Sequence, residues 1–207
     1  MRSVVFDLGG VLVDWDPRYL YRKLFSDEEE MERFLSEVCS PRWNRQLDLG
    51  RPFEEAVAEL RARHPRYARE IEAYHSRWGE MLGGPIAGSV ELLGRLRGRG
   101  VPLYALTNWS SETFAIARKR YGFLGWFEEI VVSGEEKVAK PDHEIYRRLV
   151  ERCRLDPRST LFVDDVEENV AAARSLGFYG VVFRSPEMLA EELARLGFLE
   201  SGVRAGG

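Results

Sequence analysis

The stretch that decides the fold is VVFDLGGVLV, residues 4–13. Val4, Val5 and Phe6 form a short apolar run that enters Asp7, and a Gly-Gly pair follows after one more residue. A β-branched and aromatic run of this length that ends at a Gly-Gly turn is typical of a buried strand. In an open α/β sheet, ligands bind outside the carboxyl ends of the strands. Asp7 is therefore the first candidate for a functional residue, and the alternative is that it only caps the turn.

The length and composition of the chain limit its class. The chain has 207 residues, of which 44% are apolar, and a net charge of −4. It can bury one core, or a core with a modest insertion. The charge argues against nucleic acid or an anionic membrane as the main partner. No apolar run approaches the roughly 20 residues that span a bilayer, so we expect a soluble, cytoplasmic protein.

The segment from residue 16 to residue 85 has a helical pattern. Asp16-Pro17 is a helix start, with aspartate at the N-cap and proline at the first helical position. No strand-like alternation appears, and residues 81–85 look like a flexible return. We therefore expect a small helical unit inserted after the first strand. Its apolar stripes are Met31, Phe34, Leu35 and Val38; Phe53, Val57 and Leu60; and Tyr67, Ile71, Tyr74, Trp78 and Met81.

From residue 86 onward the pattern alternates between strand and helix. This alternation predicts an α/β fold with a mainly parallel, doubly wound sheet and right-handed crossovers. The domain prediction is a core of residues 1–15 and 86–199, a helical cap of residues 16–85 and a flexible, glycine-rich tail of residues 200–207. Cys39 and Cys153 lack metal-type spacing and are expected to be free thiols. Strands are expected at 102–107, 130–132, 161–163 and 180–183.

Three of these strands end in polar residues or are followed by them. Because the carboxyl ends of parallel strands share one edge, we expect these residues to lie beside Asp7. Each has a structural alternative: a hydroxyl can cap the next helix, a loop lysine can be solvated, and paired aspartates often begin a helix. Their joint appearance at one edge favours a functional site. The residues are Thr107, Asn108, Lys140, Asp164 and Asp165.

This set of groups suits phosphoryl transfer. Three neighbouring carboxylates raise one another's pKa unless a cation lies among them, and oxygen ligands suit Mg²⁺. A carboxylate can then attack phosphorus while the metal, an ammonium and a hydroxyl neutralise the phosphoryl oxygens. We therefore expect Asp7 to form an aspartyl-phosphate that water hydrolyses.

Four segments, FDLGGVLVD, LTNWS, AKPD and LFVDD, resemble the four motifs of the haloacid-dehalogenase-like (HAD) superfamily in their order. The resemblance spans residues 4 to 177. It implies a Rossmann-like core with a helical cap inserted after the first motif. It also implies that Asp7 is the nucleophile, that Thr107 binds phosphate and that Lys140 steadies both. Asn108, beside Thr107, is a further candidate for substrate binding.

The resemblance also implies a magnesium site. Asp7 and Asp165 are the expected direct ligands, and Asp164 lies behind them or binds the ion through water. The residue two after the nucleophile supplies a backbone carbonyl, which is Gly9 here. The expected substrate is a small phosphorylated metabolite.

Gly9 is the main departure from the family pattern, because most phosphatases of the superfamily carry an acid–base aspartate at this position. A similar start resembles the subgroup of bacterial sugar-phosphate phosphatases that act on glucose 1-phosphate. Asp14 is the nearest substitute in sequence, although it reads better as a turn residue. Without the acid we expect a preference for acyl, aryl or anomeric sugar phosphates, whose leaving groups need little protonation.

Two alternatives remain open at the level of sequence. A metal-independent 2-haloacid dehalogenase also lacks the second aspartate, but its pattern has serine and asparagine where this chain has Asp164-Asp165. The other alternative is a catalytically weak binding protein that keeps the fold.

Substrate choice is expected to lie in the cap. Arg42, Trp43 and Arg45 lie near a break between two predicted helices, and Arg51 lies in the next turn. Arginine suits a second phosphate or carboxylate, and tryptophan suits a sugar face. The alternative is that Trp43 packs the cap and the arginines are solvated. Trp15 and Trp109 are candidates to line the cavity, and the sequence is compatible with a monomer or a homodimer.

Overall fold

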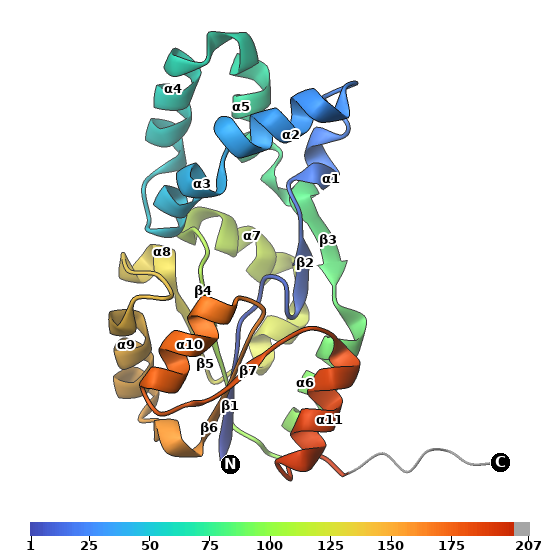
Figure 1. The fold of residues 1–207 in the computed structure, drawn as a ribbon, viewed down its shortest axis with the longest axis vertical. Helices are drawn as coiled ribbons and strands as arrows, with labels where there is room; N and C mark the ends of the chain where they lie inside the picture. Colours follow the sequence, from blue (N-terminus) through green and yellow to red (C-terminus); the bar gives the residue numbers. More distant parts are fainter. Residues whose placement is uncertain (201–207) are drawn as a thin grey trace, which may run out of the picture.

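The computed structural model describes residues 1–200, and the predicted tail beyond Glu200 lies outside the described residues. Figure 1 shows a lower α/β core and an upper helical cap, joined by two extended segments. The core contains a five-stranded parallel sheet in the order β5-β4-β1-β6-β7. This confirms the predicted α/β fold. The strands are β1 (Ser3–Phe6), β4 (Leu103–Thr107), β5 (Glu129–Val132), β6 (Thr160–Asp164) and β7 (Tyr179–Val182).

Strand β1 lies at the centre of the sheet because its side chains are apolar on both faces. Val4 and Phe6 belong to one hydrophobic cluster, and Val5 belongs to the other. Helices α6 (Ala87–Gly98), α7 (Ser111–Arg120) and α11 (Pro186–Arg195) contribute side chains to the first cluster, whereas α9 (His143–Cys153) and α10 (Glu167–Ser175) contribute to the second. Each face of the sheet is therefore covered by helices.

Capping residues fix where several helices begin. Asp142 precedes α9, and its carboxylate accepts a hydrogen bond from the backbone N–H of Glu144 at 2.9 Å. Ser185 caps α11 in the same way, with Pro186 at the first helical position. These side chains satisfy N–H groups that a helix leaves free in its first turn.

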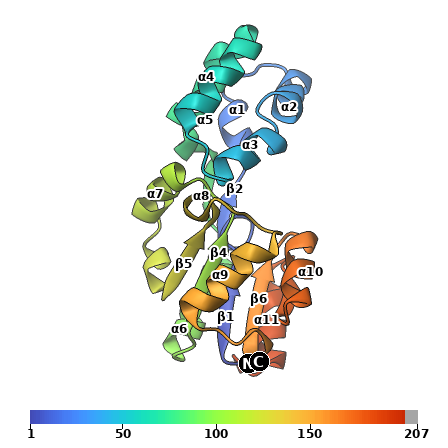
Figure 2. The same cartoon turned by 90° about the vertical axis from the view of Figure 1, so that its left-hand side faces the viewer.

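The cap follows β2 (Val13–Trp15) and ends at β3 (Leu82–Pro85), and these two strands pair in an antiparallel manner. Residues 82–85 therefore form a strand, although the sequence indicated an irregular return. Figure 2 shows the cap helices beyond the carboxyl ends of the core strands. The cap helices are α1 (Arg18–Tyr21), α2 (Glu28–Glu37), α3 (Pro41–Asp48), α4 (Phe53–Arg63) and α5 (Ala68–Ser76), with short 3₁₀ turns at Pro65–Tyr67 and Trp78–Met81.

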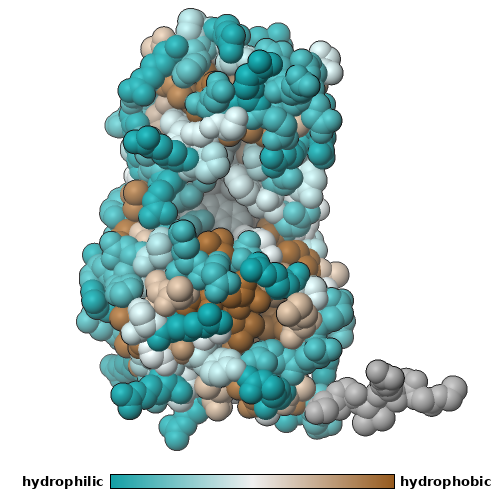
Figure 3. Space-filling view, viewed as in Figure 1, coloured by the Kyte–Doolittle hydropathy of each residue, from teal (hydrophilic) through white to brown (hydrophobic). Residues whose placement is uncertain are grey.

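An aromatic cluster packs the cap. The rings of Tyr21 and Phe34 have centroids 4.9 Å apart, and Phe34 meets Tyr67 edge-on at 5.2 Å. Figure 3 shows mostly hydrophilic residues over the visible face of the cap and a narrowing of the surface between cap and core. Both cysteines are free, as predicted. Within residues 1–200, no helix is long and apolar enough to cross a membrane.

Candidate active site

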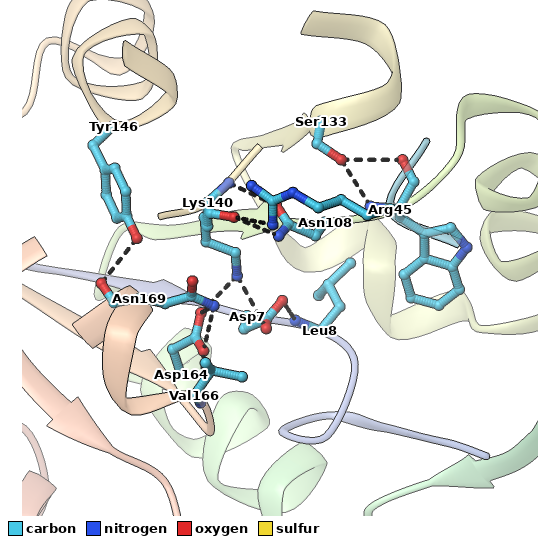
Figure 4. A network of polar contacts seen from close by, with 11 residues as sticks. Asp7, Leu8, Arg45, Asn108, Ser133, Lys140, Tyr146, Asp164, Val166 and Asn169 are labelled. Carbon is cyan, nitrogen blue, oxygen red and sulfur yellow. Dashed lines mark hydrogen bonds and ion pairs between the residues drawn. The ribbon is translucent and has the colours of Figure 1, made fainter. Parts of the chain in front are cut away.

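The sheet brings the predicted site residues to its carboxyl edge. Asp7 directly follows β1, and its backbone N–H continues the ladder to the carbonyl of Val163 at 2.8 Å. Thr107 and Asp164 are the last residues of β4 and β6. Lys140 comes from the loop between the short helix α8 (Ser133–Glu136) and α9. Figure 4 shows Asp7, Asp164 and Lys140 pointing toward one another.

Lys140 joins two carboxylates in the interior. Its Nζ lies 3.0 Å from Oδ2 of Asp7 and 2.6 Å from Oδ2 of Asp164, and its side chain is fully buried. Burial acts to lower the pKa of Lys140, but the two carboxylates outweigh it and hold the pKa above its ordinary value. The ammonium is therefore charged and is shared between the candidate nucleophile and Asp164.

Asp164 is held on both of its oxygens. The side-chain amide of Asn169 donates to them at 3.0 and 3.1 Å, and the backbone N–H of Val166 donates to Oδ1 at 2.9 Å. These bonds, together with Lys140, satisfy a carboxylate that is completely buried. Asp164 therefore serves to fix Lys140 and the loop that follows β6.

Asn108 and Arg45 fix the backbone at Lys140. The Asn108 amide donates to the carbonyl of Lys140 at 3.0 Å and accepts from the N–H of Lys140 at 2.9 Å. From the cap, Nη1 of Arg45 donates to the same carbonyl at 3.3 Å. In this structure both side chains hold Lys140 in its loop (Figure 4), and their predicted contact with substrate stays a prediction.

Three acidic side chains can hold a metal ion. Carboxylate oxygens of Asp7, Asp164 and Asp165 lie within 4.8 Å of one another. Burial raises the pKa of Asp7 to about 7; Lys140 opposes this shift, and the charges of Asp164 and Asp165 add to it. Burial and Asp164 also raise the pKa of Asp165. A divalent cation among these oxygens would relieve the repulsion, and a set of oxygen donors fits Mg²⁺.

Two glycines leave room beside the acidic residues. Gly10 has a φ of +72°, and a Cβ on it would overlap the Asp165 carboxylate. Gly9, which follows Asp7 by two residues, has open space where a side chain would stand. The turn after β1 therefore lets Asp165 approach the backbone closely. Because position 9 is glycine, this turn supplies no acidic side chain two residues after Asp7.

A cavity of about 290 Å³ lies between these residues and the cap. Trp15 and Trp109 line it, as the sequence suggested, and so do residues that the sequence did not indicate. Trp43 does not line it: its ring is buried in the cap and meets Tyr74 edge-on at 5.0 Å. The core side is lined by Asp7, Gly9, Gly10, Asn108, Ser110, Thr113, Asp165, Val166 and Asn169, and the cap side by Asn44, Asp48, Phe53 and Trp78.

Asp48, the last residue of α3, is a lining residue that the motifs do not reveal. The amide of Asn44 donates to its Oδ2 at 2.9 Å, and Asn44 in turn accepts from the hydroxyl of Tyr74 at 2.8 Å. Burial raises the pKa of Asp48 to about 7, against a lowering effect of Arg45. In the sequence Asp48 reads as part of a turn, so only the packing of α3 against the core could identify it.

Asp14, the nearest acidic substitute in sequence, lies in β2 outside the residues that line the cavity. Its Oδ2 accepts a hydrogen bond from the hydroxyl of Tyr19 at 2.6 Å. This contact ties Asp14 to the first cap helix. It is therefore a residue of the connection between core and cap.

The sheet, the inserted helices and the lysine between two carboxylates agree with the architecture that the four sequence motifs imply. The family of haloacid dehalogenase-like hydrolases matches residues 1–177. The chain belongs to this family, which confirms the resemblance carried by its four motifs.

Relatives of known activity cover most of the chain. A sesquiterpene phosphatase of Aspergillus oryzae is 28% identical over 181 residues, which make up 87% of this chain and 88% of the relative. A phosphorylated carbohydrates phosphatase of Thermotoga maritima is 27% identical, covering 88% of this chain and 86% of the relative. A HAD family enzyme of Bacteroides thetaiotaomicron, solved with magnesium and inorganic phosphate, has a TM-score of 0.68 and 25% identity, covering 89% of this chain and 95% of that one.

Proposed function

We propose that this protein is a Mg²⁺-dependent phosphatase that hydrolyses a small phosphate monoester through an aspartyl-phosphate on Asp7. The observation that carries the proposal is the pairing of Lys140 with both Asp7 and Asp164 next to a third carboxylate, Asp165. The phosphatase activities of the Aspergillus oryzae and Thermotoga maritima relatives support it, as does the magnesium and phosphate complex of the Bacteroides thetaiotaomicron enzyme.

Asp7, Asp165 and the carbonyl of Gly9 would hold the ion, with Asp164 behind them. When bound, Mg²⁺ neutralises charge on the phosphoryl oxygens and keeps Asp7 ionised near neutral pH. All of these proposed ligands are oxygen atoms, which Mg²⁺ prefers.

The side chains of the chain itself carry out the transfer. The carboxylate of Asp7 attacks phosphorus, the bond between phosphorus and the leaving oxygen breaks, and the organic group departs as an alkoxide or phenoxide that takes its proton from water. The Lys140 ammonium and the Thr107 hydroxyl stabilise the negative charge on the phosphoryl oxygens. Water then attacks phosphorus, which releases phosphate and restores Asp7.

The absence of an acid at Gly9 predicts a dependence on the leaving group. We expect kcat/KM for 4-nitrophenyl phosphate to exceed that for a simple primary alkyl phosphate by about 100-fold, because general acid catalysis contributes at least this much where it operates. Phosphate release from both esters, measured under the same conditions, checks this. Comparable values for the two would contradict the prediction and indicate that another residue protonates the leaving group.

A sugar phosphate is one candidate substrate. The start of the chain, Asp7-Leu-Gly9, resembles that of sugar-phosphate phosphatases, and the Thermotoga maritima relative acts on phosphorylated carbohydrates. The aromatic lining of the cavity is compatible with a sugar face.

The competing function is a metal-independent 2-haloacid dehalogenase. A metal-independent enzyme would hold its small carboxylate substrate beside Asp165 and Asp48 with no metal ion to offset their charge, whereas the phosphatase has the proposed Mg²⁺ there, which favours the phosphatase. The two functions separate in paired assays with Mg²⁺ present, one for phosphate release from 4-nitrophenyl phosphate and one for chloride release from 2-chloropropanoate. We expect phosphate without chloride. Chloride without phosphate would assign the dehalogenase. The absence of both products would assign a binding protein.

A further inference from the structure

Much of the lining of the cavity is aromatic. Trp15, Phe53, Trp78 and Trp109 all line it, and the rings of Trp78 and Trp109 have centroids 5.6 Å apart at an angle of 51°. Three of these four residues come from the cap or the segments that carry it. Flat aromatic surfaces bind the apolar faces of ring systems and hydrocarbon chains. The part of a substrate that lies beyond its phosphate therefore meets mainly apolar surface.

The ionisable groups that line the cavity are acidic. Asp48 is the ionisable residue that the cap contributes to the lining, and within residues 1–200 no lysine or arginine lines the cavity. Asp7 and Asp165 lie at the end of the cavity near Lys140, where the proposed ion would bind. Among residues 1–200, the Asn44 amide is the one hydrogen-bond donor to the Asp48 carboxylate.

The nearby arginines are engaged elsewhere. Arg45, the arginine whose charge acts on Asp48, donates to the carbonyl of Lys140 and lines a neighbouring hollow. Arg51 donates to the side-chain oxygen of Gln46 at 2.7 Å and pairs with Glu59. Neither guanidinium lines this cavity, and the hollow that Arg45 lines lies beside it, with Asp48 at the boundary of the two.

Contacts to the backbone hold Asp48 at the boundary of cap and core. The hydroxyl of Ser133 donates to the carbonyl of Asp48 at 2.6 Å and accepts from the N–H of Trp109 at 2.9 Å. Because Ser133 follows β5 and Trp109 follows β4, the end of α3 is fixed to the core at the rim of the sheet. The Asp48 carboxylate is thus positioned from both sides, through Asn44 in the cap and through Ser133 in the core.

We propose that this cavity takes phosphate monoesters whose organic part is uncharged and presents a flat apolar face, and that Asp48 excludes substrates with a second anionic group. The inference rests on the proposed phosphatase function and specifies its substrate class. Its physical basis is selection by repulsion: a carboxylate or phosphate on the organic part would come close to a second negative charge in a partly buried site. Arginines that could reverse this preference lie outside the cavity.

The test compares two aryl phosphates of nearly equal shape. We expect 4-methylphenyl phosphate to have a kcat/KM at least about 10-fold above that of 4-carboxyphenyl phosphate, since the carboxylate of the second ester would be repelled by the charge of Asp48. The assay is run with Mg²⁺ at about pH 8.5, where Asp48, with its pKa of about 7, is ionised. The carboxylate makes the phenol the better leaving group, so leaving-group chemistry works against the expected result.

Two variants test whether Asp48 causes the preference for the uncharged ester. Asp48→Asn keeps the shape and the bond from Asn44 but removes the charge, and it should reduce the preference to within about 3-fold, since the repulsive charge is gone. Asp14→Asn is the matched control, because it removes a carboxylate outside the cavity, and it should keep the full preference. Equal or faster hydrolysis of 4-carboxyphenyl phosphate by the native chain would overturn the inference, as would an unchanged preference in a folded Asp48→Asn chain.

Binding of inhibitors that are not hydrolysed tests this inference independently of the proposed phosphatase function. 4-Methylbenzylphosphonate and 4-carboxybenzylphosphonate replace the ester oxygen by carbon and are not hydrolysed, so calorimetry with Mg²⁺ measures selectivity without turnover. Tighter binding of the methyl compound supports the inference even where no phosphate is released from any ester, which would refute only the phosphatase proposal. Equal binding of the two phosphonates, or tighter binding of the carboxyl compound, would refute the inference while phosphate release continued to support the enzyme.

Discussion

Asp7→Asn is expected to lower kcat for phosphate release by at least about 10⁴-fold, the order of loss seen when a nucleophile is removed from a preorganised site. The amide keeps the shape of the side chain, and its oxygen can accept the hydrogen bond from Leu8 N–H. Its nitrogen cannot accept from the Lys140 ammonium, and the amide cannot attack phosphorus as a carboxylate does. Steady-state phosphate release at saturating substrate measures the loss.

The stability of the same variant distinguishes lost chemistry from lost folding. The folded-state pKa of Asp7 is raised to about 7 from 3.8, so the folded protein holds this proton more tightly than the unfolded chain does. Without metal, the stability contributed by Asp7 is complete below pH 3.8 and is lost as the pH rises through about 7. Asparagine carries no such penalty, so the melting temperature of metal-free Asp7→Asn at about pH 8 should be no lower than that of the native chain.

Asp14→Asn provides the matched control for activity. It makes the same chemical change at a carboxylate that binds Tyr19 and does not line the cavity. Its kcat should stay within about 3-fold of the native value, as for a substitution outside the reacting groups. A native-like kcat in Asp7→Asn, or an equal loss in both variants, would contradict the assignment of Asp7 as nucleophile.

Lys140→Met should both unfold more easily and lose turnover. Methionine fits the volume, but it leaves Asp7 and Asp164 without the ammonium that lies 3.0 and 2.6 Å from them. Removing one partner of a buried ion pair typically costs about 3–5 kcal/mol, because the remaining charge is buried and uncompensated. Thermal unfolding of the metal-free protein should therefore show a melting temperature lower by about 10 °C or more.

Lys137→Met is the control for that measurement. Lys137 lies in the turn after α8, close in sequence to Lys140, and its ammonium donates to the carbonyl of Gly50 at an exposed position. Its loss should cost less than about 1 kcal/mol, as is usual for exposed charged groups. Equal destabilisation by the two substitutions would show that Lys140 is not the central cation of the site.

The core could be predicted from sequence because each of its strands and helices is marked by a pattern of neighbouring residues. Short apolar runs that end in polar residues, separated by helical periods, allow little other than a parallel sheet, and a parallel sheet brings its carboxyl ends to one edge. Asp7, Thr107 and Asp164 reach that edge because each ends or directly follows a buried strand. The β3 strand was missed because Leu82-Gly-Gly-Pro85 has no strand propensity of its own and takes this form by pairing with β2.

The cap side of the site could not be predicted in the same way. Trp43, Arg45 and Asp48 all belong to α3, and which of them faces the cavity depends on how this helix packs. Contacts between residues far apart in sequence decide this, such as the bond from Ser133 to the carbonyl of Asp48. The role of Asn108 likewise depends on its two bonds to the backbone of Lys140, which no motif reveals.

The magnesium dependence of phosphate release tests the central claim most directly. Native protein is freed of metal with EDTA and assayed on 4-nitrophenyl phosphate before and after Mg²⁺ is restored, with Asp7→Asn measured alongside. We expect release only in the native chain with Mg²⁺, since both the ion and the Asp7 carboxylate are needed. Release that persists without metal, or that survives in Asp7→Asn, would contradict an aspartyl-phosphate mechanism at this site.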